Sequence, residues 1–182
     1  MKTGYDDEFR AFVRERRAGL LGTATLLTAG DHHLAEDLTQ TALTALYVKW
    51  PAFRLAQHKN SYARRCLVNA FIDEKRRPWQ RRERVTDEIP EHLVLSTLMP
   101  IDQGEPNQRT EALYTGLRAL PVRMRAVLVL RYFQELSVEE TAEAMNCSTG
   151  TVKSQSKRAI DKLRERMSPQ FAVQGSHGAH DA

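Results

Sequence analysis

The spacing of apolar side chains is the feature that most constrains this fold. Apolar residues recur at every fourth position through Leu34, Leu38, Ala42, Leu46 and Trp50. This spacing places them on one side of an α-helix, whereas a half-buried strand needs an alternating pattern, which is nearly absent from the chain. The sequence therefore predicts an all-α protein.

The first 80 or so residues predict three helices packed around one core. The first carries apolar residues from Phe9 to Leu21, and a break at Gly30 is followed by Asp31, a residue type that caps the start of a helix. The second helix is predicted to end at Pro51. The third begins near Ser61 and is predicted to end at Pro78.

Composition excludes several classes of protein. The 182 residues include 27 Lys and Arg against 23 Asp and Glu, and 41% of the chain is hydrophobic, which is ordinary for a soluble globular protein. The longest charge-free, apolar-leaning stretch covers 18–30, and a membrane span needs about 20 apolar residues. The charged N-terminus is unlike a signal peptide, so we expect no membrane insertion and a cytoplasmic location.

Cysteine and histidine positions give no metal or disulfide pattern. Cys66 and Cys147 lie far apart in the sequence, which suggests two reduced thiols, and His177 and His180 stand in the tail without companions. No Gly-rich phosphate loop or catalytic triad spacing is present. We therefore expect no metal, no cofactor and no enzymatic activity.

Opposite charges are segregated in the middle of the chain. Six basic residues fall between Lys75 and Arg84, and five acidic residues with no Lys or Arg follow between Asp87 and Glu105. This pattern is typical of a helix end that faces nucleic acid, followed by a linker. Charge alone fits equally well with a solvated helix end and a loop.

The strongest local signal lies between Leu136 and Met167. Ser137 followed by Glu140 is a capping box, which predicts a helix from Val138. The residues Asn146-Cys147-Ser148 indicate a turn, with Ser148 capping a second helix. A short helix, a tight turn and a longer helix describe a helix-turn-helix.

The second of these helices has a small, polar and basic outer face. Such a face suits the recognition helix of a DNA-binding protein, because small residues let the helix enter the major groove while Lys and Arg reach bases and phosphates. An ordinary helical hairpin with a solvated basic face is the alternative. The predicted DNA contacts are Thr151, Lys153, Ser154, Gln155, Lys157 and Arg158.

Two blocks of the chain resemble a known family. The string LPVRMRAVLVLRYFQELSVEETAEAMNCSTGTVKSQSKRAIDKLRERM closely resembles the fourth conserved region of bacterial sigma factors. Independently, AEDLTQ at Ala35–Gln40 and YARRCLVNAFIDEKRR at Tyr62–Arg77 resemble the second conserved region. Both blocks in order, with a short acidic connection, resemble the extracytoplasmic function (ECF) group, and actinobacterial members in particular.

The resemblance implies a role for each block. The fourth region would recognise the promoter −35 element, although Gln155 stands where many relatives have Arg, which leaves the base preference open. The second region would read and open the −10 element, with Asn69 as the base-specific residue. Its implied −10 contacts are Arg64, Arg65, Asn69, Lys75, Arg76, Arg77 and Trp79, and its implied polymerase contacts are Asp37, Gln40, Thr41 and Thr44.

The resemblance also implies a domain plan and partners. We expect sigma region 2 at 1–82, a flexible linker at 83–111, region 4 at 112–168 and a disordered tail at 169–182. The expected partners are promoter DNA and core RNA polymerase, through its β′ clamp helices and β flap. An anti-sigma factor wedged between the two helical modules is a further expectation, with the apolar linker residues Leu93, Leu95, Leu98 and Met99 as a contact. A helix-turn-helix regulator that acts without polymerase is the alternative function.

Overall fold

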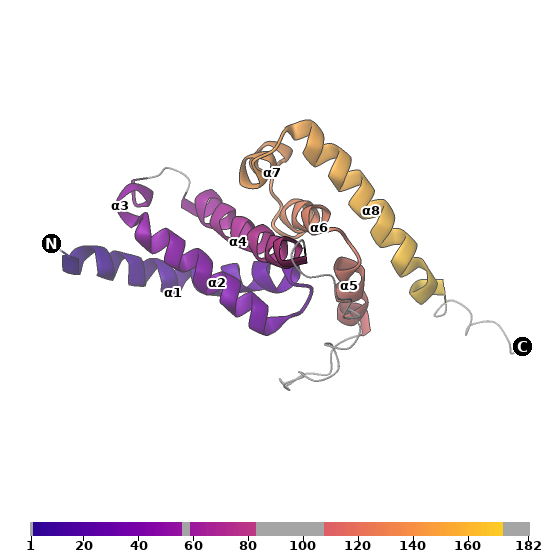
Figure 1. The fold of residues 1–182 in the computed structure, drawn as a ribbon, viewed down its shortest axis with the longest axis horizontal. Helices are drawn as coiled ribbons and strands as arrows, with labels where there is room; N and C mark the ends of the chain where they lie inside the picture. Colours follow the sequence, from indigo (N-terminus) through magenta and orange to yellow (C-terminus); the bar gives the residue numbers. More distant parts are fainter. Residues whose placement is uncertain (1, 56–58, 83–107, 173–182) are drawn as a thin grey trace, which may run out of the picture.

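The computed structural model describes residues 2–55, 59–82 and 108–172, and within these ranges every regular element is a helix (Figure 1). The predicted all-α class is confirmed. The N-terminal module consists of α1 (Lys2–Leu27), α2 (His32–Val48), α3 (Trp50–Phe53) and α4 (Lys59–Arg82). The C-terminal module consists of α5 (Gln108–Arg118), α6 (Val122–Leu128), the π-helical turn η1 (Val129–Phe133), α7 (Val138–Met145) and α8 (Thr149–Ala172).

Of the two predicted proline stops, the one at Pro51 is close to the observed end of the second helix and the one at Pro78 is wrong. Helix α2 ends at Val48, and Pro51 lies in the first turn of α3, where its missing N–H group has no partner to lose. Helix α4 continues through Pro78 to Arg82. An internal proline removes one hydrogen bond and crowds the carbonyl four residues earlier, yet α4 continues beyond it, and among the described side chains Ile72 is the last buried one before Pro78.

Part of the predicted linker and tail falls outside the described residues. Residues 83–107 and 173–182 are not described, and they include the four apolar linker residues and both tail histidines. Inside the described ranges, α5 starts at Gln108 within the predicted linker. Helix α8 extends to Ala172, four residues past the predicted start of the tail after Ser168.

The predicted caps form as hydrogen bonds. The Asp31 carboxylate accepts from the Leu34 N–H at 3.0 Å and starts α2. Ser137 and Glu140 form both bonds of the capping box, since the Ser137 hydroxyl accepts from the Glu140 N–H at 3.0 Å and the Glu140 carboxylate accepts from the Ser137 N–H at 2.8 Å. These local signals set helix starts because they satisfy backbone donors that have no partner inside the helix.

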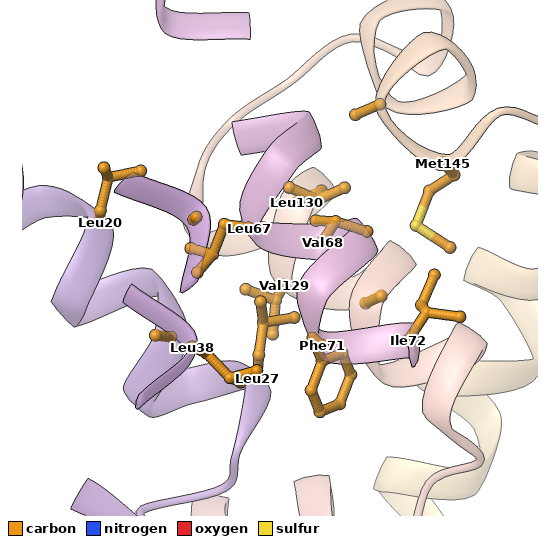
Figure 2. Close-up of a cluster of buried hydrophobic side chains, with 14 of the residues drawn as sticks. Leu20, Leu27, Leu38, Leu67, Val68, Phe71, Ile72, Val129, Leu130 and Met145 are labelled. Atoms are coloured by element: carbon orange, nitrogen blue, oxygen red, sulfur yellow. The ribbon is translucent and has the colours of Figure 1, made fainter. Parts of the chain in front are cut away.

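Helix α4 runs through the middle of the molecule and is buried on two sides (Figure 1). Leu67 points towards the other N-terminal helices, and both Leu67 and Phe71 are fully buried (Figure 2). Val68 and Ile72 lie one position further along, on the side of the C-terminal module, and are 0% and 8% exposed (Figure 2). One helix therefore contributes to the packing of both modules.

The C-terminal module packs directly on the N-terminal module. Helix α7 contacts α4, and η1 contacts α1. Figure 2 shows Met145 of α7 facing Ile72, with Leu130 beside Val68. The buried apolar residues of both modules form one continuous core. The space between the modules, where sequence analysis placed an anti-sigma wedge, is filled by this packing.

We expect Leu130→Ala to lower the free energy of unfolding by about 2–5 kcal/mol, because it leaves a cavity in the core that both modules share. Leu130 is 0% exposed, and Leu55, at 75% exposed, provides the matched control in Leu55→Ala. Urea unfolding followed by circular dichroism gives both values. An equal effect of the two substitutions would contradict a core that runs through Leu130.

Candidate nucleic-acid interface

The structure forms the predicted helix-turn-helix from α7 and α8. Helix α7 ends at Asn146, which adopts the left-handed conformation (φ 49°, ψ 55°) that reverses the chain. The Ser148 hydroxyl then accepts from the Thr151 N–H at 3.1 Å and caps α8. Val152 and Ala159 are fully buried and hold α8 against the rest of the module.

The predicted −35 residues lie on or beside the outer face of α8. Four of the six are exposed: Lys153, Ser154, Lys157 and Arg158. Thr151 is half-buried, and its hydroxyl lies 2.9 Å from that of Ser148, so this side chain is engaged at the start of the helix. The exposed set combines three cations with a hydroxyl, a combination that can hold phosphates and meet base edges in a groove.

Gln155 is placed differently from these four. It is half-buried, and its side-chain oxygen is sequestered from solvent with no hydrogen-bond partner among the described residues. A buried amide oxygen without a donor is costly, so binding that turns the amide outwards recovers a hydrogen bond. Base reading by Gln155 therefore involves a side-chain rearrangement that reading by Ser154 does not.

The predicted −10 residues whose side chains are described lie along α4, on more than one side of the helix. Asn69, Lys75 and Arg76 are exposed, and Arg64 and Arg65 are half-buried. Phe71, which sequence analysis kept in the core, is fully buried. The side chains of Arg77 and Trp79 lie outside the described residues.

The predicted polymerase contacts form an exposed surface on α2. Asp37, Gln40, Thr41 and Thr44 are all exposed, opposite the buried stripe that includes Leu38, Ala42 and Leu46. The neighbouring Glu36 accepts a hydrogen bond from the Arg17 guanidinium at 2.6 Å, which joins α2 to α1. The exposed face therefore belongs to a helix that is fixed by its buried stripe and by the contact between Glu36 and Arg17 of α1.

Sequence analysis missed a surface pocket at the start of α4. The pocket has a volume of about 330 Å³ and is lined by Val48, Lys49, Pro51, Ala52, Phe53 and Tyr62. The Tyr62 and Phe53 ring centroids lie 5.4 Å apart in a tilted arrangement, and a second tilted pair joins Phe53 to Trp50 at 5.2 Å. Aromatic walls with a nearby ammonium group suit the flat face of a nucleobase. The signal in the sequence was the aromatic cluster around Trp50, which periodicity alone assigns to the core.

Tyr62 and Asn69 lie seven residues apart on α4, which is about two helical turns along the same side of the helix. Arg65 and Arg76 fall on the same side at helical spacing. The pocket, the amide and these cations form a strip along α4. We call Tyr62, Arg65, Asn69 and Arg76 the α4 strip.

The surroundings of Cys66 and the arrangement of the His, Cys, Asp and Glu side chains bear on whether the described residues form a reactive or metal-binding site. Burial raises the pKa of the Cys66 thiol, opposed by the nearby positive charges of Lys49 and Arg65, so the uncharged thiol is favoured at neutral pH. Within the described residues, no group of three or more His, Cys, Asp or Glu side chains is placed to hold a metal ion. No helix in the described part of the chain is long and apolar enough to cross a membrane.

These features define a class of protein: an all-α, two-module DNA-binding protein with a helix-turn-helix in its second module. Comparison with known families gives the same division. The family model for Sigma-70 region 2 matches residues 12–82, and that for Sigma-70 region 4 matches residues 116–165.

Proteins with similar sequences are named as RNA polymerase sigma factors. The chain is 35% identical to the RNA polymerase sigma-E factor of Streptomyces coelicolor, over 88% of this chain and 86% of that protein. It is 28% identical to the ECF RNA polymerase sigma factor SigW of Bacillus subtilis, over 76% and 78% of the two chains. The chain therefore belongs to the sigma-70 family of RNA polymerase sigma factors, in the ECF group.

A solved structure shares the fold. The sigma factor RpoE of Bartonella quintana, in complex with the anti-sigma factor NepR, aligns with a TM-score of 0.66 at 23% identity, over 88% of this chain and 97% of that one. The similarity therefore extends across both modules.

Proposed function

We propose that this protein is an alternative sigma factor that binds core RNA polymerase, recognises −35 and −10 promoter DNA and assists strand opening. The observation that carries this proposal is the presence of two separate exposed surfaces, on α8 and along α4, within a chain that belongs to the sigma factor family. The protein supplies binding rather than covalent chemistry. It acts in the cytoplasm, because its polymerase and DNA partners are there.

The exposure of these two surfaces supports a division of labour between them. Helix α8 enters duplex DNA at the −35 element through Lys153, Ser154, Lys157 and Arg158, all of which are exposed. The α4 strip receives the opened −10 strand, with Asn69 reading a base and the arginines holding phosphates. The Tyr62 pocket takes a base that has left the stack. The module boundaries at 1–82 and 112–168, and the linker and tail between and after them, remain part of this proposal.

The α2 face binds the polymerase. Asp37 and Gln40 are exposed on a helix fixed by its buried stripe, so they offer polar groups to a partner without disturbing the core. The partner surfaces expected from the family resemblance are the β′ clamp helices for α2 and the β flap for the C-terminal module. A regulatory anti-sigma protein is the further partner, as seen for the Bartonella relative.

We expect Asp37→Ala combined with Gln40→Ala to weaken binding to core polymerase and to reduce run-off transcription, while the isolated chain stays folded. The matched control is His32→Ala, because His32 is exposed on the same helix and points away from the predicted face at helical spacing. Co-purification with core subunits measures binding. Transcription from a two-element promoter that is equal for all variants would contradict the α2 assignment. Failure of the wild-type chain to bind polymerase would favour a regulator that acts alone.

We expect Arg158→Ala to weaken binding to every −35 sequence and to lower the slope of log K against log salt by about 0.9, because one phosphate contact is lost. Substitution of Ser154 or Gln155 should instead change which −35 bases are preferred. Fluorescence anisotropy with a set of −35 duplexes, using polymerase holoenzyme, separates the two effects. An equal loss of affinity from all three substitutions, with unchanged base preference, would show that the reading face is placed wrongly.

We expect Tyr62→Leu to weaken binding of the opened −10 strand by about 1–3 kcal/mol, because a stacking platform for one base is lost. Tyr62→Phe keeps the ring and should bind as the wild type does. Holoenzyme binding to a single-stranded −10 oligonucleotide is the measurement, and −35 duplex binding is the internal control. A loss in both assays would show a general folding defect and contradict a base pocket.

A further inference from the structure

Ser154 is exposed on α8, and its hydroxyl group already makes one hydrogen bond within the helix. The side-chain oxygen of Ser154 lies 3.0 Å from the carbonyl oxygen of Thr151, three residues earlier. A carbonyl oxygen can only accept a hydrogen bond, so the Ser154 hydroxyl is the donor in this contact. Its proton is directed to the backbone, and the lone pairs of its oxygen remain for a ligand.

This bond favours one direction of hydrogen bonding with a ligand. Donation from Ser154 to a ligand breaks the bond to the Thr151 carbonyl, because a hydroxyl has a single proton. Acceptance from a ligand keeps that bond and adds a second one to the same oxygen. Hydrogen bonds linked through one group polarise and strengthen each other. Ser154 is therefore placed to accept.

The other predicted −35 residues offer no exposed acceptor. Three of them are exposed cations, whose side chains can only donate: Lys153, Lys157 and Arg158. The side-chain oxygen of Gln155 is buried. The hydroxyl of Thr151 is half-buried and lies 2.9 Å from that of Ser148. Among these six residues, Ser154 is therefore the one exposed acceptor on a face of donors.

Gly150 leaves space beside Ser154. It is exposed and lies four residues earlier, on the same side of α8. A Cβ atom at Gly150 would meet only the Ser148 hydroxyl oxygen, at 3.8 Å, and the backbone there is right-handed helical, so neither packing nor conformation requires a glycine. A glycine in a helix is less stable than an alanine. The missing side chain gives a group from outside the protein access to Ser154.

The major groove of duplex DNA presents donors on two of the four bases. Adenine exposes its N6 amino group and cytosine its N4 amino group, whereas guanine and thymine present only acceptors and a methyl group. A protein acceptor that faces a base acceptor leaves both oxygens without a proton, which disfavours binding. An acceptor at Ser154 therefore separates adenine and cytosine from guanine and thymine.

We propose that Ser154 is a specificity-determining residue of the −35 interface, and that its oxygen accepts a hydrogen bond from the exocyclic amino group of an adenine or a cytosine. The inference rests on the promoter function proposed above, and it adds the class of base that one position of the −35 element carries. The base edge enters over Gly150, in the first turns of α8, which are the turns of a recognition helix that contact bases.

The test combines a serine variant with duplexes that lack single amino groups. The full-length chain, assembled into polymerase holoenzyme, is titrated by fluorescence anisotropy with the −35 duplex that the wild type binds best in a randomised set. In further duplexes, each adenine is replaced in turn by purine and each cytosine by pyrimidin-2-one, which removes the amino group and keeps the ring. Ser154→Ala is compared with the wild type. Arg158→Ala is the matched control, because Arg158 is exposed on the same helix and only donates.

At one position, we expect removal of the amino group to weaken wild-type binding about three- to tenfold, the effect of losing one hydrogen bond. Ser154→Ala should lose this dependence at that position, whereas Arg158→Ala should keep it. Weaker base pairing in the altered duplex affects all three proteins alike, so it cancels in the comparison. The analogue that shows the effect, purine or pyrimidin-2-one, identifies the base.

Equal losses for the wild type and a folded Ser154→Ala protein at every adenine and cytosine would overturn the assignment. Coupling of Ser154 to guanine N7, measured with 7-deazaguanine, would overturn it too, because it would show a hydroxyl that donates outwards.

A second variant tests the space beside Ser154. Gly150→Ala should leave the chain folded and at least as stable to heat, yet lower its affinity for the −35 duplex and remove the dependence on the amino group. Wild-type affinity in Gly150→Ala would show that the base does not enter there. If wild-type holoenzyme binds no −35 duplex better than a scrambled one, the promoter function itself is wrong. Sequence-specific binding without coupling to an amino group rejects the role of Ser154 alone.

Discussion

Burial of α4 on two sides is the constraint on which the rest of the structure depends. Neighbouring residues on this helix face different modules: Leu67 lies towards the N-terminal helices, and Val68 and Ile72 lie towards α7 and η1 (Figure 2). A helix buried over so much of its circumference has a narrow remaining side. The α4 strip is that side, and this limits where opened DNA can meet the N-terminal module.

Electrostatic contacts contribute less to stability at the exposed surface than at the buried contact between the modules. The surface ion pair between Arg10 and Asp7 joins side chains that are about 70% exposed, and such pairs contribute little to stability. Arg125 is buried and meets three carbonyl oxygens from two modules. Removing a donor there leaves a buried acceptor without a partner, which costs more than the loss of an exposed pair. The buried Arg125 therefore contributes more to the contact between the modules than an exposed ion pair does.

The core shared by the two modules is distinct from the α2 face. Apolar residues from both modules form one buried core, and removing them from water stabilises the contact between the modules. The exposed α2 face is separate from this core, because its polar residues lie on the opposite side of the helix from its buried stripe.

The sequence by itself determined the local structure: the helical class, the Ser137 capping box, the Asn146 turn and the exposed faces of α2 and α8. These follow from interactions between residues three or four positions apart, which periodicity and capping rules describe well. Pro78 misled because a proline disfavours a helix interior without forbidding it, and α4 continues through it to Arg82. Only the tertiary structure decided the pocket at Tyr62, the buried oxygen of Gln155 and the hydrogen bond from Arg125 to Leu27. These depend on contacts between residues far apart in the chain, and Arg125 and Leu27 are separated by 98 positions, a distance over which local spacing carries no information.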